Sequence, residues 1–298
     1  MSPPLIFDRA LIRRRLSRAA QGSPAEFLIA HVADDLNERL KPILRRFPLA
    51  IELGGATSHG ARALLESGKV ERVVRLASLR PSGPDGFPSV VADEETLPLG
   101  QASVDLVASL LSIQAVNDLP GALAQIKRSL RPDGLFIACL LGGETLTELR
   151  QSMAEAETQL SAGVSPRVAP FADARDLGAL LQRAGFALPV TDVEKLTVRY
   201  DDAFALMHDL RAMGMTNPMV ERARKPLRRA TLLRAAQTYA ERFADLDGRL
   251  RATFDLVWLS AWAPHESQQR PLRPGSAKSR LADALGASEI KAGEKAKP

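Results

Sequence analysis

The sequence predicts an α/β fold that is built on a parallel sheet with crossover helices. Short apolar segments alternate with segments of helical periodicity through the first half of the 298-residue chain. Residues 135–141 (LFIACLL) contain no polar side chain except Cys139, as expected for a strand covered on both faces. Strand–helix alternation at this spacing is typical of parallel sheets whose strands are joined by helices.

Each element follows from its local pattern. Strands are expected, in chain order, at residues 49–53, 72–77, 89–92, 104–111, 135–141, 193–200 and 253–262. Helices are expected at residues 60–67, 120–130, 145–162, 173–184, 204–213 and 226–243. Pro120 stands at a helix start, and residues 131–134 (RPDG) carry turn chemistry that should end this helix. Thr145 and Glu148 form a capping-box pattern, and Asp202 should cap a later helix.

These elements divide the chain into five parts. We expect an N-terminal helical segment (1–48), a core (49–200), a helical lid insertion (201–249), a final strand with its C-terminal loop (250–276), and a disordered tail (277–298). An insertion at this point can stand over the carboxyl ends of the strands, where open α/β sheets bind ligands.

Composition excludes several classes of protein. No apolar run approaches the roughly 18 to 20 residues that a membrane helix needs. The single cysteine excludes a disulfide framework and favours a reducing compartment. The net charge is only +5 and few aromatic residues lie among the basic ones, so no nucleic-acid partner is expected. Residues 11–18 (LIRRRLSR) fit either a transit peptide or a surface helix, and Asp8 just before them favours the helix.

A candidate cofactor loop follows the first strand. There the chain reads Glu52-Leu53-Gly54-Gly55-Ala56, and a glycine turn that opens onto a helix suits a nucleotide-type ligand. The loop resembles the acid-x-Gly-x-Gly-x-Gly loop of S-adenosylmethionine-dependent methyltransferases, with Ala56 and Ser58 where glycines are usual. The predicted cofactor contacts are Glu52, Gly54, Gly55, Ala56, Asp93, Glu94 and Ser109.

Candidates for chemistry are few. Glu144, just past the fifth strand, is the candidate catalytic residue because a carboxylate can bind a guanidinium, although a first-turn acid is also favoured by the helix dipole. His59 and His265 are the histidines that could reach the carboxyl end of the sheet, but we expect no metal site. The methionines of the insertion suit either core packing or an apolar lid. A basic run, Arg222 to Arg229, is expected to be a solvated face.

Motifs along most of the chain resemble one family, the methyltransferase-like assembly factors of respiratory complex I. They occupy residues 6–9, 92–98, 116–120, 131–134, 142–150, 165–171, 176–178, 183–186, 213–217 and 265–277. The family is related to the malonyl-carrier-protein methyltransferases of biotin synthesis, and its mitochondrial member is an arginine hydroxylase that acts on an iron–sulfur subunit of complex I.

The resemblance implies a class I methyltransferase (Rossmann-like) fold: a seven-stranded sheet with its last strand antiparallel, helices on both faces and a helical insertion before the last strand. It implies S-adenosylmethionine as cofactor, the iron–sulfur subunit of complex I as protein partner, and a bacterial cytoplasmic location, with attachment to the periphery of the inner membrane left open.

The sequence departs from this family in the cofactor pocket. Residues 76–78 end the second strand without the acid that binds the ribose, and Gln114-Ala115 replaces a common His-Trp pair. Three functions therefore stay open: an enzyme acting on a protein in complex I assembly, a small-molecule or carrier-protein methyltransferase, and a non-catalytic assembly protein. The two enzyme hypotheses require that Thr57, Ser58 and His59 leave the pocket open.

Overall fold

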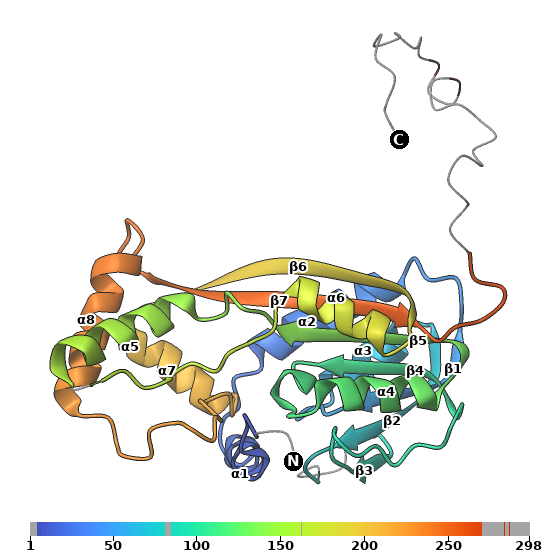
Figure 1. Cartoon of the computed structure of the whole chain (residues 1–298), viewed down its shortest axis with the longest axis horizontal. Helices are drawn as coiled ribbons and strands as arrows, with labels where there is room; N and C mark the ends of the chain where they lie inside the picture. The colour runs from blue at the N-terminus through green and yellow to red at the C-terminus, as the bar shows by residue number, and fades with distance from the viewer. Residues whose placement is uncertain (1–4, 81–84, 162, 270–282, 284–285, 287–298) are drawn as a thin grey trace. The chain divides into compact units, whose positions relative to one another are not determined.

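The computed structural model describes residues 5–80, 85–161, 163–269, 283 and 286. The described residues up to Pro264 form one compact unit around a seven-stranded sheet with the strand order β3-β2-β1-β4-β5-β7-β6 (Figure 1). The pairs β1–β2, β1–β4, β2–β3 and β4–β5 are parallel, whereas β7 runs antiparallel to both β5 and β6. The predicted mostly parallel sheet with an antiparallel last strand is confirmed.

The elements have the following bounds. The strands are β1 (Phe47–Leu53), β2 (Val70–Ala77), β3 (Ser89–Val91), β4 (Val104–Leu110), β5 (Leu130–Leu141), β6 (Ala187–Tyr200) and β7 (Leu250–Trp262). The helices are α1 (Arg9–Ala20), α2 (Phe27–Leu40), α3 (His59–Glu66), α4 (Leu119–Ser129), α5 (Thr147–Leu160), α6 (Ala174–Arg183), α7 (Ala203–Ala212) and α8 (Arg229–Phe243), with a 3-10 turn η1 (Ile113–Ala115).

Two apolar cores lie on opposite faces of the sheet, because successive side chains of a strand point to opposite sides. Ile137 and Cys139 of β5 face the core beneath α2 and α3, whereas Phe136 and Ala138 face the core beneath α4 and α6. The first core continues beyond the strand ends into the group formed by α5, α7 and α8, which Figure 1 shows beside the long strands β6 and β7. The helical segment between β6 and β7 therefore shares a core with the sheet.

Local capping signals were right where no tertiary partner competes. Asp202 accepts hydrogen bonds from the backbone of Phe204 and Ala205, and Pro120 lies in the first turn of α4. Residues 131–134, expected to form a turn, are instead counted within β5. A positive φ of 62° at Asp133 and a register irregularity between β4 and β5 mark the bend there.

The prediction of a capping box formed by Thr145 and Glu148 is wrong. The Thr145 hydroxyl bonds the backbone of Asp255 in β7, and the Glu148 carboxylate accepts from the Thr253 backbone at 3.1 Å. The helix begins at Thr147 instead, preceded by Leu146 with a φ of 55°. Both capping side chains are used to join α5 to the last strand, which leaves a non-glycine residue in the sparsely populated left-handed region.

The remaining described residues, 265–269, 283 and 286, belong to a second unit. Within it the His265 ring bonds the Ser267 hydroxyl at 2.7 Å, and the His265 amide donates to Gln268 Oε1 at 3.2 Å. The tail that we expected to be disordered from residue 277 lies, apart from 283 and 286, outside the described residues. Among the described helices, none combines the length and the apolar character that crossing a bilayer requires.

Candidate functional site

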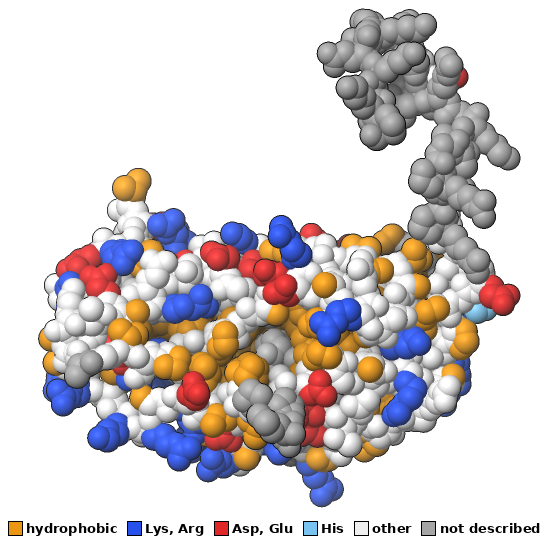
Figure 2. Space-filling model, in the orientation of Figure 1, with side chains coloured by type: hydrophobic (Ala, Val, Ile, Leu, Met, Phe, Trp, Pro, Cys, Tyr) orange, Lys and Arg blue, Asp and Glu red, His pale blue; other side chains and the backbone are white. Residues whose placement is uncertain are grey.

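A cavity of about 850 Å³ lies at the carboxyl ends of the parallel strands. Its walls come from the β1–α3 loop (Gly54), the segment after β4 (Leu111), helix α1 (Leu16), helix α5 (Leu149) and the segment after α7 (Met213). Figure 2 shows apolar side chains in a hollow near the middle of the molecular face that it displays. The volume falls within the roughly 300 to 1,000 Å³ that is typical of small-molecule and cofactor sites.

Arg75 of β2 holds the β1–α3 loop in place. Its Nε atom lies 3.0 Å from the Glu52 carboxylate, and it also pairs with Asp85. It donates further hydrogen bonds to the carbonyl oxygens of Gly55, at 2.9 Å, and Thr57, at 2.5 Å. A guanidinium has five N–H donors in a fixed fork, so one side chain can bind both the acid that ends β1 and the loop that follows it.

The Glu52–Arg75 pair is fully enclosed, with side-chain exposures of 1% and 3%. Burial raises the pKa of Glu52 to about 7, and the Arg75 guanidinium acts in the opposite direction. Arg75 was not predicted, because the family pattern places an acid, not an arginine, on this strand. The available signal was an arginine at an apolar position of the strand pattern.

Two glycines of the loop are required by close contacts with side chains. Gly54 has a φ of 82°, and a Cβ atom there would lie 1.9 Å from Ser112 Oγ and 2.8 Å from Glu94 Oε1. A Cβ atom on Gly55 would lie 1.6 Å from Glu52 Oε1. Ala56 is exposed and borders the cavity. The side chains of Ser112, Glu94 and Glu52 therefore leave no room for a Cβ atom at these two positions.

Helix α1 is attached to the acidic segment after β3. Arg9 pairs with Asp93 at 2.9 Å and with Glu94, and Arg13 pairs with Asp93 at 2.7 Å. The Ser112 hydroxyl donates to Glu94 at 2.7 Å. Burial alone would lower the pKa of Arg9, but the two carboxylates outweigh it and raise that pKa. These contacts make α1 a wall of the cavity.

The pKa of Asp93 is lowered. Burial would raise the pKa, but the backbone N–H of Glu95 and the guanidinium of Arg9 stabilise the ionised form. Asp93 is therefore ionised at neutral pH, and its ion pairs anchor α1.

The predicted cofactor residues fall into two groups. Gly54, Ala56 and Glu94 line the cavity. Glu52, Gly55 and Asp93 do not line the cavity. They support the residues that line it, through the contacts described above.

Two predicted site residues lie elsewhere. Ser109 is fully buried in β4, where its hydroxyl donates to the Leu53 carbonyl at 3.1 Å, and it is not part of the cavity wall. Glu144 is exposed and also lies outside the lining. The Ser109 hydroxyl is occupied by a backbone carbonyl inside the core, and Glu144 lies in a loop whose backbone is bonded to Asp255 of β7. Neither residue therefore belongs to the proposed site.

The pocket is open at the positions that could have blocked it. Thr57 and Ser58 belong to its wall, and His59 turns aside to bond the Thr57 hydroxyl at 3.0 Å. Met213 and Met215 both pack against the core and line the cavity, which fits the interpretation as core packing. Their role as an apolar lid stays a prediction. Within the described ranges, no three His, Cys, Asp or Glu side chains are placed to hold a metal ion.

Comparison with known proteins identifies the family. A methyltransferase domain model matches residues 56–138. The arginine-hydroxylase NDUFAF5 of Danio rerio is 39% identical over 287 residues, which cover 93% of this chain and 89% of that protein. The human NDUFAF5 is 42% identical over 280 residues, covering 91% and 81% of the two chains.

More distant relatives have the same fold. A malonyl-[acyl-carrier protein] O-methyltransferase of Methylovorus is 34% identical over 275 residues, covering 87% of this chain and 90% of that protein. The crystal structure of the YcgJ protein from Bacillus subtilis superposes with a TM-score of 0.52 at 13% identity, covering 79% of this chain and 99% of that one. Sequence identity over nearly the whole of both chains places the protein in the NDUFAF5 arginine-hydroxylase family, on a methyltransferase-type fold.

Proposed function

We propose that this protein binds S-adenosylmethionine in the cavity above the strands and acts on an arginine side chain of a protein subunit of respiratory complex I. The observation that supports it most is the open cavity, lined by Gly54, Ala56, Thr57 and Ser58, in a chain about 40% identical to the arginine-hydroxylase relatives. The iron–sulfur subunit of complex I is the substrate that the sequence resemblance implies.

The residues present fit a nucleoside cofactor in an altered way. In place of an acid at the end of β2, the wall carries Arg75, Ser78 and Asp85. Asp85 retains acceptor capacity beside its Arg75 pair, since each carboxylate oxygen has two lone pairs, and Ser78 can both donate and accept. We assign these two side chains to the ribose hydroxyls, and we place Glu94 near the adenine base. When bound, the cofactor supplies a methyl group activated on a sulfonium.

The other half of the cavity suits an aliphatic side chain. Met207, Leu210, Met213 and Met215 line it. Methionine side chains adapt to varied shapes, which fits the stem of an arginine presented by a protein surface. Much of the rate in such reactions comes from holding the reacting groups in line, and the fixed loop and helices of this site do that.

The carrier-protein alternative has less support. The malonyl-[acyl-carrier protein] O-methyltransferase of Methylovorus is 34% identical to this chain, against 39 to 42% for the arginine-hydroxylase relatives from Danio and human.

Filling the cavity mouth is expected to abolish cofactor binding. Ala56 is exposed and lines the cavity, so Ala56→Trp adds bulk there without disturbing the core. Calorimetric titration with S-adenosylhomocysteine should show saturable binding to the wild type and none to this variant. Ala230→Trp, at an exposed position of α8 outside the cavity wall, is the matched control and should bind normally. Absence of binding to the wild type at millimolar ligand contradicts the proposal.

The substrate can be tested in a deletion strain. Mass spectrometry of complex I subunits should show an arginine of the iron–sulfur subunit that is modified only when the gene is present, and the added mass separates an oxygen atom from a methyl group. An arginine that is identical in both strains rejects the proposed substrate.

A further inference from the structure

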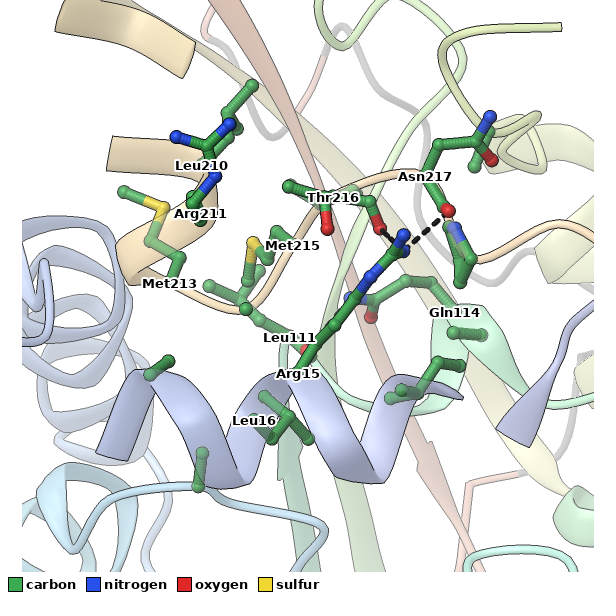
Figure 3. A pocket seen from close by; sticks show the side chains of 18 of the residues that line it. Arg15, Leu16, Leu111, Gln114, Leu210, Arg211, Met213, Met215, Thr216 and Asn217 are labelled. Carbon is green, nitrogen blue, oxygen red and sulfur yellow. Dashed lines mark hydrogen bonds between the residues drawn. The ribbon is translucent and has the colours of Figure 1, made fainter. Parts of the chain in front are cut away.

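One half-buried guanidinium in the cavity wall, that of Arg15, forms no ion pair with the described carboxylates, and Asp8 only partly offsets the effects that lower its pKa. Arg15 of α1 is half-buried, and its Nη1 atom donates to the backbone carbonyl oxygens of Thr216, at 2.8 Å, and Asn217, at 2.5 Å (Figure 3). Burial, and after it the neighbouring Arg222 guanidinium, lower the pKa of Arg15, although an arginine remains charged at neutral pH.

The other enclosed arginines of this wall are compensated. Arg9 pairs with Asp93 and Glu94, Arg75 with Glu52 and Asp85, and Arg222 with Asp8 at 3.2 Å. Arg211 also lacks a carboxylate partner among the described residues, but it is exposed and water can solvate it. A half-buried cation without a partner is costly, and an anion bound in the cavity would offset that cost.

A second group near this point lacks a hydrogen-bond partner. The Gln114 amide nitrogen donates to the Leu111 carbonyl at 2.8 Å, which fixes the amide so that Oε1 is the free acceptor. This oxygen is buried and has no hydrogen-bond partner in the described structure. Figure 3 shows Arg15 and Gln114 extending into the same part of the cavity, one from α1 and the other from the turn after β4.

The two groups have complementary requirements. Arg15 offers N–H donors to a carboxylate, and Gln114 Oε1 offers an acceptor to an ammonium. A carboxylate and an ammonium on one carbon are the α-amino-acid end of a ligand, and S-adenosylmethionine ends in that group. Building on the proposed binding of this cofactor, we infer that Arg15 and Gln114 hold its amino-acid end, the guanidinium on the carboxylate and the amide oxygen on the ammonium.

The position of Arg15 is set by the attachment of its helix. Asn117 Oδ1 accepts from the backbone of Ile6 and Phe7, each at 2.8 Å, and Arg9 ties the first turn of α1 to the acids after β3. The guanidinium is therefore presented to the cavity by a fixed helix, so no ordering of the chain is needed when the ligand binds.

The test compares two ligands that differ in the amino-acid end. S-adenosylhomocysteine carries the carboxylate and the ammonium, whereas methylthioadenosine carries neither. By calorimetry, Arg15→Gln should weaken S-adenosylhomocysteine binding about tenfold to a hundredfold, as expected for a lost charge-assisted hydrogen bond, and leave methylthioadenosine binding unchanged. Gln114→Leu should show the same selectivity with a loss of about tenfold. Arg15→Lys, which keeps the charge, should recover part of the lost affinity.

A control variant and three different outcomes separate the role of Arg15 from the binding of the cofactor itself. Arg14→Gln, an exposed neighbour on α1 without an ion pair in the described structure, should leave both affinities unchanged. Equal weakening of both ligands by Arg15→Gln would mean that Arg15 only secures α1, and no weakening of either would mean that it touches no ligand; both results overturn the inference while the cofactor proposal stands. If the wild type binds neither ligand, the cofactor proposal itself fails, and the inference with it.

Discussion

Replacing Arg75 with methionine is expected to lower the free energy of unfolding by about 3 to 5 kcal/mol, because the substitution leaves Glu52 buried without its partner. The variant also loses the hydrogen bonds to Gly55 and Thr57 that hold the loop, so S-adenosylhomocysteine binding should disappear with it. Urea denaturation measures the first effect and calorimetric titration the second.

The loss at Arg75 should depend on pH. The pKa of Glu52 is already raised to about 7 by burial, and removing the guanidinium raises it further. A raised pKa in the folded state favours the protonated form, so stability from this group is present at low pH and is lost as the pH rises through the folded value. The variant should therefore lose more stability at about pH 8 than at about pH 5.

The matched control lies on the same strand. Arg72 of β2 is exposed and has no ion pair in the described structure, so Arg72→Met should change the free energy of unfolding by less than about 0.5 kcal/mol. An Arg75→Met variant as stable as the Arg72→Met variant would show that the buried pair does not organise the loop.

Replacing Gly54 with alanine is expected to destabilise the protein by about 2 to 5 kcal/mol and to remove cofactor binding. A left-handed backbone costs a residue with a Cβ atom about 1 to 2 kcal/mol, and forcing atoms into a packed site adds about 1 to 3 kcal/mol. Both costs apply here, because φ is 82° and the new atom would lie 1.9 Å from Ser112 Oγ. Thermal or urea unfolding, with S-adenosylhomocysteine titration, checks both expectations.

Gly68 separates the two costs at Gly54. Its φ is 66°, but nothing lies within 4 Å of the position where a Cβ atom would be. Gly68→Ala should therefore lose only the backbone share, about 1 to 2 kcal/mol, and should keep cofactor binding. Equal losses in the two variants would mean that Ser112 and Glu94 do not crowd Gly54.

Periodic patterns predicted the sheet because burial acts on every residue of a strand. The apolar run that became β5 and the alternation that became β6, an edge strand, each reflect which faces are covered. Asp202 was also predictable, because a capping side chain needs only its own helix.

The candidate site was predictable only in part. Gly54 and Glu94 were identified from their places in the loops, and both line the cavity. Glu144 was assigned from its position after β5, yet it is exposed and outside the wall. Arg15 was overlooked in an arginine-rich helix, because sequence does not show which of several arginines has a carboxylate within reach.

The succession of strands and helices along the chain, the glycine turn and the helical segment before the last strand were determined by the sequence itself, since burial periodicity and backbone freedom are properties of neighbouring residues. Only the tertiary structure decided which polar and charged side chains meet. Residues from different elements come together in three contacts: Arg75 with Glu52, Thr145 with β7, and Arg9 with the acids after β3. The strength of a charge contact depends on distance and burial, and only the folded chain sets both.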